Sequence, residues 1–377
     1  MDLTTLTAAV LVALALLVTD AAVHAGSVEL EVEVAPKIEN VSLDKGTLEV
    51  EFQHRLEEII SIPSVVPPPE IRSRRDQGVG MALAEMVNAR EIVYALQRQV
   101  GYDSDYIRFA LLVEDGKVQG SVSGHSHLVG NFTRVISRNE GESIQALIQR
   151  SCLWGATQLA PYYAGIFMLQ QGAVDNDFSE VIALAQHAKA VLPPTPTSYD
   201  RSLFDNLLGL VALFQKDAKA ARTAFDTAIA DDPTNPLPFL NAALTDVQLA
   251  DYQKAADRMD DLVRLARPSD KILLGTAYMI WGAALFELHD RDGADRMLAT
   301  STRINPYSSI AFALWADHKK LEDNTAEAER LYRMAREAST SIENYAGVAA
   351  LYFRLAVSEV PPLTRTRFAN PKVLTLH

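Results

Sequence analysis

The chain has 377 residues, of which 48% are hydrophobic, so it can bury the core of two domains, or of one domain and an elongated array. Its net charge of −13 argues against nucleic acid or an anionic membrane surface as the main partner, because both attract basic patches. Cys152 is the only cysteine, which excludes an internal disulfide, a CxxC redox pair and a thiolate zinc site. We expect it to be a small core residue.

The N-terminal segment, 1–26, contains an uncharged apolar run. The run at 3–23 has about 20 residues, the length that crosses a bilayer. Two interpretations stay open: a transmembrane signal anchor, or a signal peptide cleaved after the small residues at 23–25. No Lys or Arg follows before Lys37, which favours export of the body. We expect a membrane-anchored protein whose body faces the periplasm of a bacterial inner membrane, or a secreted periplasmic protein if the segment 1–25 is removed.

Residues 27–140 are predicted to form a small α+β domain with an antiparallel sheet and at least one covering helix. Apolar and polar residues alternate at 27–34 and at 47–53, as in half-buried strands. A proline-containing connector and a helix follow, at 61–71 and 78–100. Further strands are predicted at 106–113, 117–124 and 127–137, and the turn 114–116 joins the first two as a hairpin.

Chemistry in this domain is sparse. His125 and His127 lie two residues apart, so on a strand both would face the same way and could begin a metal site, but nothing nearby supplies a third ligand. The glycines at 78–80 lack the GxGxxG spacing, and the sequence contains no GxSxG, HExxH or P-loop motif. We therefore expect no catalytic, cofactor or metal site. An enzyme with its site in residues 27–140 is a less favoured alternative, and the two histidines would be its candidates.

The second half of the chain contains an internal repeat. Gly209 is followed at fixed offsets by Ala221, Phe225, Ala228 and Pro233, which is the order of small, aromatic, small and proline positions in a helix-pair repeat. The pattern recurs three more times with a period of about 34 residues, the length of such a unit, and a five-residue insertion precedes the third unit. The key alanines are Ala221, Ala255, Ala294 and Ala328.

Residues 202–340 therefore resemble a tetratricopeptide repeat (TPR) protein of the bacterial membrane-anchored or exported type. The resemblance implies an all-α superhelix of about four to five helix pairs within 141–357. Residues 160–194 are a candidate degenerate first unit, 341–357 a capping helix and 358–377 an extended tail. In each pair the small residues let the two helices approach closely, and Phe225 is expected to fill the seam to the next unit.

The resemblance also implies a concave groove formed by the first helix of each pair, with a mostly apolar lining. Lys320 is the only basic residue at the concave positions, so the groove is not expected to clamp an acidic peptide terminus. An apolar lining should be covered, either by a partner's amphipathic helix or strand or by the chain's own 141–172 helices or tail. The predicted groove residues are Leu203, Asn206, Leu210, Leu213, Phe214, Leu237, Leu240, Leu244, Val247, Met279, Phe286 and Ile310.

The leading hypothesis is a non-enzymatic protein–protein interaction scaffold or assembly factor. It would be held in the membrane by residues 3–23 and would bind other proteins through the apolar groove. The alternative is a permanent accessory subunit of a large membrane complex, whose partners would be the neighbouring membrane subunits. Nucleic acid is not expected as a partner, for the charge reason given above.

Overall fold

The computed structural model describes six stretches of the chain: 27–34, 45–60, 70–73, 105–114, 117–192 and 198–338. The chain divides into two compact units, one of Met1–Ile62 and Pro68–Phe167, the other of Pro63–Pro67 and Met168–His377. Within the described stretches, no helix has the length and apolar character to cross a bilayer. Four predicted segments lie outside them: the anchor or signal peptide at 1–26, the helix at 78–100, the capping helix at 341–357 and the tail.

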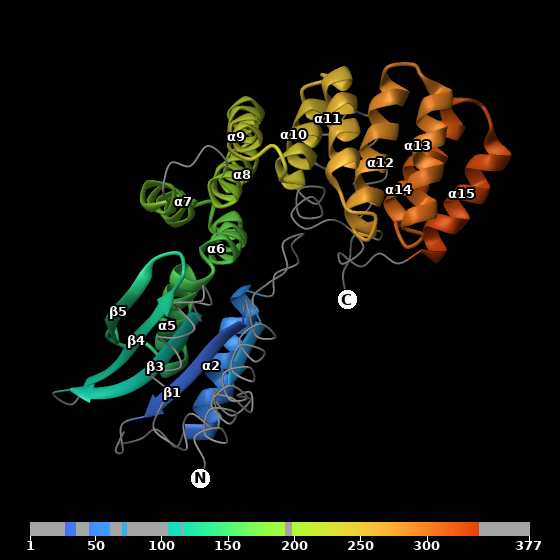
Figure 1. Ribbon diagram of the computed structural model, residues 1–377. Helices are drawn as coiled ribbons and strands as arrows, with labels where there is room; N and C mark the ends of the chain where they lie inside the picture. The colour runs from blue at the N-terminus through green and yellow to red at the C-terminus, as the bar shows by residue number, and fades with distance from the viewer. Residues whose placement is uncertain are drawn as a thin grey trace, which may run out of the picture. The chain divides into compact units, whose positions relative to one another are not determined.

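The first unit contains a sheet of strand order β2-β1-β3-β4-β5 (Figure 1). β1 (Ser27–Val34) pairs in parallel with both β2 (Glu70–Ser73) and β3 (Asp105–Glu114). β4 (Lys117–Ser126) pairs antiparallel with β3 and with β5 (Gly130–Ser137). The predicted β1, β3, β4 and β5 are confirmed, but the prediction of an antiparallel sheet is wrong for the β2-β1-β3 half. A helix follows β1, and such a crossover lets β2 run parallel to it.

The predicted strand at 47–53 is wrong, because these residues lie in helix α2 (Lys45–Ile60). Its buried side chains follow helical spacing, and Arg55 bonds Glu51 one turn earlier at 3.0 Å. Alternation over seven residues fits less than two helical turns, so it does not distinguish the two structures. The buried residues of α2 are Leu48, Phe52, Leu56, Ile59 and Ile60.

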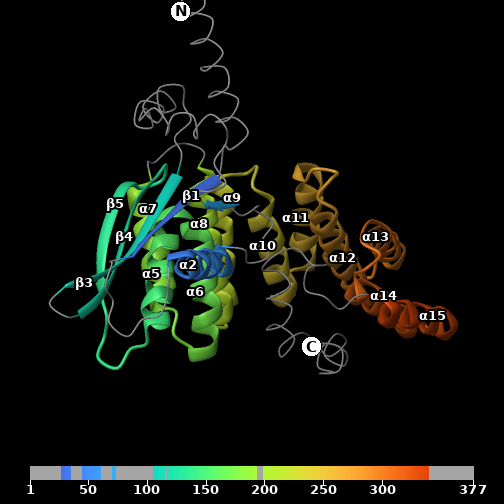
Figure 2. The ribbon, with the colours of Figure 1, turned by 90° about the horizontal axis from the view of Figure 1, so that it is seen from below.

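α2 and α5 (Ile144–Leu159) pack against the sheet and against each other (Figures 1 and 2). Phe52 of α2 stacks on Phe109 of β3 with ring centroids 4.3 Å apart. α5 approaches closely at Gly155, where a Cβ atom would meet Ile107 at 2.4 Å. α5 therefore belongs to the sheet unit, and the predicted boundary at residue 140 is wrong. The glycine gives α5 a flat contact on the sheet, which its apolar pattern alone does not reveal.

The second unit is an array of helices, and its described residues form the four predicted pairs (Figure 1). Two helices precede them where the degenerate unit was predicted: α6 (Pro161–Asp175), within which the division between the two units falls, and α7 (Ser179–Val191), which packs on α8. The pairs are α8 (Tyr199–Phe214) with α9 (Ala218–Asp231), α10 (Pro236–Gln248) with α11 (Tyr252–Leu265), α12 (Lys271–Glu287) with α13 (Arg291–Ile304), and α14 (Ser309–Leu321) with α15 (Thr325–Glu337).

The turn inside each pair repeats with the same period as the alanines. One non-glycine residue in each turn has a positive φ between 59° and 65°, the left-handed conformation that closes a helix C-terminus. The next backbone N–H then bonds back to the first helix, as Asp217 does to Ala212 at 2.9 Å. Each turn residue precedes the key alanine of its pair by the same offset, so the backbone itself follows the predicted repeat. These turn residues are Lys216, Ala250, His289 and Asp323.

In two of the pairs a glycine of the first helix faces a large residue of the second. A Cβ atom on Gly209 of α8 would lie 2.4 Å from the ring of Phe225 in α9, and one on Gly282 of α12 would lie 2.7 Å from Leu298 in α13. Phe225 therefore packs against the first helix of its own pair, and its predicted contact with the next unit stays a prediction. Ala221 and Ala228 are fully buried, as expected for close-approach positions.

Candidate interaction surface of the helical array

The predicted groove residues lie on the first helices α8, α10, α12 and α14. Among these, α10 contacts α8 and α12, and α12 contacts α14, so neighbouring first helices form a continuous layer. Because residues from successive units meet in this layer, a segment running across it would touch several repeats at once. The layer is the candidate interaction surface, and we call it the concave layer below, after the groove that the TPR resemblance predicts.

The concave layer is covered rather than open. Of the twelve predicted residues, eight are buried, whereas Phe214, Val247, Phe286 and Ile310 are half-buried. The half-buried ones lie near the ends of their helices, so they form the accessible rim of the surface. The surface therefore combines a covered apolar centre with an apolar rim.

A pair of asparagines joins the first two units inside this layer. Asn241 of α10 donates its Nδ2 to Oδ1 of Asn206 in α8 at 2.8 Å, and both side chains are at most 1% exposed. The bond fixes the orientation of the Asn206 amide, whose own Nδ2 is buried and has no acceptor among the described residues. Sequence analysis named Asn206 but missed Asn241. A second asparagine 35 residues later, close to one repeat period and also in an apolar helix, was the available signal.

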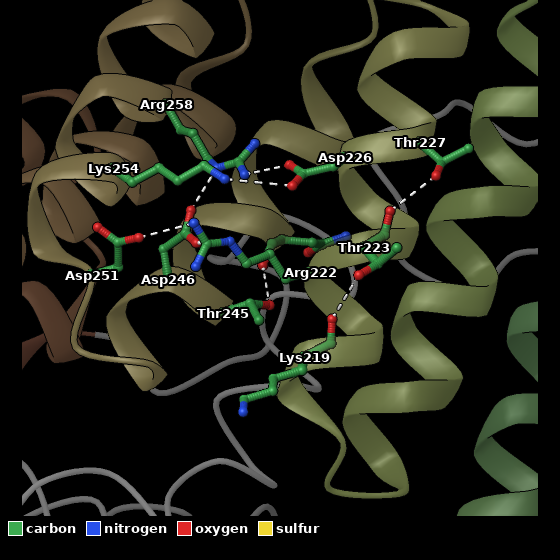
Figure 3. A network of polar contacts seen from close by, with 11 residues as sticks. Lys219, Arg222, Thr223, Asp226, Thr227, Thr245, Asp246, Asp251, Lys254 and Arg258 are labelled. Carbon is green, nitrogen blue, oxygen red and sulfur yellow. Dashed lines mark hydrogen bonds and ion pairs between the residues drawn. The ribbon is translucent and has the colours of Figure 1, made fainter.

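A buried ion-pair network crosses the boundary between the first two pairs (Figure 3). Asp246 of α10 is 0% exposed, accepts from Nε of Arg258 at 2.5 Å and lies 3.1 Å from Nε of Arg222 in α9. Arg222 also pairs with Asp251 at 2.9 Å, and Arg258 with Asp226. Burial raises the pKa of the Asp246 carboxyl, although both guanidinium groups oppose this. Every charge of the network is neutralised by a neighbouring helix, so we assign it to holding the units together.

The positions of Arg222 and Asp246 recur at each boundary between pairs, because they keep the period of the key alanines. At the second boundary both are apolar. At the third the charges are reversed, and Asp295 also accepts from the indole Nε1 of Trp315 at 2.8 Å. In chain order the three equivalent couples are Arg222–Asp246, Ala256–Leu285 and Asp295–Lys319.

Asp205 of α8 is a second buried carboxyl of the array. It forms an ion pair with Lys189 of α7, and its other oxygen is buried with no bonding partner among the described residues. Burial raises the pKa of Asp205 to about 6; Lys189 opposes this shift, and the nearby Asp231 carboxyl of α9 adds to it. The joint between α7 and α8 thus contains a group that changes charge close to neutral pH.

His318 of α14 was missed by sequence analysis. Its ring stacks on Phe286 of α12 with centroids 3.7 Å apart, and burial lowers its pKa to about 3, with a smaller effect from Lys319. The imidazole is therefore neutral at physiological pH and lies buried against Phe286 of the rim. Nothing in its sequence context, where two lysines follow, signalled a buried position.

The two histidines of the sheet unit do not act together. His125 lies in β4, and its Nδ1 is 2.9 Å from Oδ1 of Asn131. His127 lies in the turn after β4, and its Nδ1 is 2.9 Å from Oδ2 of Asp105, so the expectation that both face the same way from a strand is wrong. No three side chains able to hold a metal gather within the described stretches. Cys152 is a core residue as expected, and burial raises the pKa of its thiol well above the ordinary value.

Comparisons with known proteins give limited information. No family model matches the chain, and no curated protein matches it. Among solved structures, MamA MSR-1 matches at 16% identity and a TM-score of 0.35, over 47% of this chain and 95% of that one. MamA AMB-1 matches at 16% identity and 0.34, over 46% and 98%. Since these scores are too low to add evidence, the description of the array as TPR-like helical repeats rests on its own helix pairs, turns and period.

Proposed function

We propose that the protein is a non-enzymatic interaction scaffold whose concave layer binds an apolar or amphipathic segment of a partner protein. The supporting observation is the continuous layer of α8, α10, α12 and α14, with an apolar centre and an apolar rim. The charged groups described beside it, such as Asp246, are already paired between helices. An amphipathic helix or an extended apolar strand is the ligand that such a layer suits.

We also propose that residues 1–26 hold the protein in a membrane with its body in the periplasm, which rests on the apolar run at 3–23. N-terminal sequencing of the mature protein tests this. Recovery of a chain that starts after residue 25 would rule out the anchor.

The alternative function is that of a permanent subunit of a membrane complex. A permanent subunit keeps a fixed stoichiometry with its partners through detergent extraction and salt washes. A scaffold exchanges its partners under the same conditions.

The binding surface is tested by photo-crosslinking in native membranes. A photoreactive phenylalanine is placed at the rim, at Val247 or at Phe286, and at the exposed Thr227 of α9 as a control. We expect the same partner adduct from both rim positions, and its loss when Val247→Asp is combined with the probe at Phe286. Equal adducts from all three positions, or none from the rim, would refute the proposal.

A further inference from the structure

Glu287 is the last residue of α12 and directly follows Phe286 of the rim. Its side chain is half-buried, and no described residue forms an ion pair or a hydrogen bond with it. The other buried or half-buried carboxyls of residues 218–338 all have such a contact, as Asp246 has with Arg258. Within this part of the array, Glu287 is therefore the carboxyl that burial has partly removed from water without a compensating contact.

The surroundings of Glu287 disfavour a negative charge. The side chain lies at the C-terminal end of a helix, where the backbone carbonyl groups carry partial negative charge. The last turn of α12 contains no basic residue, and neither do the last turns of α8 and α10. Burial raises the pKa of the Glu287 carboxyl, and His289 in the following turn opposes this. The rim is therefore negative at the ends of these three helices, and Glu287 adds a carboxylate to it.

The cationic groups beside the rim do not compensate Glu287. Arg291 at the start of α13 lies over the ring of Phe286, 5.8 Å from its centroid, but its ion pair is with Glu322 at 3.9 Å. The second helices begin at the same edge, and the positive ends of α9 and α13 are each capped by an aspartate side chain. The charge of Glu287 is therefore left for a molecule that binds at the rim.

We propose that the segment bound at the concave layer is a basic amphipathic one, in which a lysine or arginine beside the apolar face pairs with Glu287; this inference rests on the proposed function. A partner that covers Phe286 also removes water from Glu287, because the two residues are adjacent. Burying an unpaired carboxylate costs free energy, so a purely apolar or an acidic segment is disfavoured. The carboxylate thereby selects among amphipathic segments that fit the apolar rim equally well.

The charge is tested by photo-crosslinking in native membranes, with the photoreactive phenylalanine at Val247, in a different helix from Glu287. Glu287→Gln keeps the size of the side chain and should lower the yield of partner adduct at least about fivefold, and Glu287→Lys should abolish the adduct. Glu329→Lys is the matched control. Glu329 is an exposed carboxylate of α15, so the same change in net charge at this position should leave the yield unchanged.

The stability of the same variants shows that adduct is not lost through unfolding. Neither Glu287→Gln nor Glu287→Lys removes a contact, and a lysine is favoured at the C-terminal end of a helix. We therefore expect the urea midpoint of both variants, followed by circular dichroism, to equal or exceed that of the wild type. A lower midpoint would show that Glu287 stabilises the fold through a partner of its own and would overturn the inference.

The partner's side of the contact is identified by mass spectrometry of the adduct formed from the probe at Phe286. The crosslinked peptide should contain a lysine or arginine within about four residues, roughly one helical turn, of the residue that reacted. An uncharged or acidic stretch there would overturn the inference. If the adduct persists in Glu287→Lys, the inference fails while the proposed function stands. If neither rim position gives an adduct in the wild type, the proposed function fails and the inference falls with it.

Discussion

Replacing Asp205 by Asn tests whether burial controls the charge at the joint between α7 and α8. The carboxyl is 4% exposed, and its pKa is raised from 3.8 to about 6, mainly by burial. Because the folded state holds this proton more tightly than the unfolded chain, the group adds stability at low pH. That contribution is lost as the pH rises from about 4 to about 6. Asparagine keeps the size of the side chain but has no charge to titrate.

The magnitude follows from the two pKa values. A shift from 3.8 to about 6 corresponds to about 3 kcal/mol between fully protonated and fully ionised Asp205. Between pH 7.5 and pH 4.5 the wild-type chain gains about 2 kcal/mol of this. Relative to the wild type, Asp205→Asn should therefore be about 2 kcal/mol less stable at pH 4.5 than it is at pH 7.5.

The assay is urea unfolding followed by circular dichroism at both pH values. The difference between variant and wild type is the quantity to compare, because the contributions of distant groups cancel in it. Thr227→Ala on the exposed face of α9 is the control, and its difference from the wild type should not change with pH because the substitution changes no titratable group. If Asp205→Asn gains stability relative to the wild type on acidification, or shows no change, then Lys189 and not burial dominates the site, and the reasoning is refuted.

Other predictions concern residues inside the core. His318→Leu should change stability with the opposite sign. The pKa of His318 is lowered to about 3, so the wild type loses stability as the pH falls below 6.5. In the same urea assay the variant should gain about 3 kcal/mol relative to the wild type between pH 7.5 and pH 4.5. Gly209→Ala should lower the free energy of unfolding by about 1–3 kcal/mol, because the new methyl group clashes with the ring of Phe225. In a double-mutant cycle, Gly209→Ala should be less destabilising in the Phe225→Leu background than in the wild type. Additive effects of the two substitutions would contradict the contact. The thiol of Cys152 should not react with a chromogenic disulfide reagent at pH 8 until the chain is unfolded in guanidinium, and rapid native reaction would contradict its burial.

The repeat was predictable because its signal is both local and periodic. Small residues, a terminal proline and a constant offset each reflect one helix pair, so Ala221 and its equivalents located all four pairs. In the sheet unit, the alternation at 27–34 indicated a strand correctly, whereas the same pattern at 47–53 belonged to a helix. Whether β1 runs parallel to β3 depends on contacts between segments far apart along the chain, which no short pattern contains.

The groove residues stay a prediction that follows from the repeat pattern. What the repeat pattern does not give is how deeply each of these positions is buried, because burial depends on the neighbouring segments. The residues that tie the units together come from different helices, as Asp246 and Arg222 do, so their meeting follows from the fold and not from spacing. His318 is another such case. Its burial arises from Phe286, which belongs to the preceding pair and lies in a different helix.

The residue couples differ at the three boundaries between pairs, so the boundaries are not equivalent. If the α10–α11 pair were lost by deletion, Arg222 would face Leu285, and the half-buried guanidinium would lose the carboxylates of Asp246 and Asp251. If α10 to α13 were lost, Arg222 would face Lys319, and two positive charges would meet at the boundary. Loss of whole units would therefore leave mismatched residues at the new boundary, so these pairs are not freely interchangeable modules.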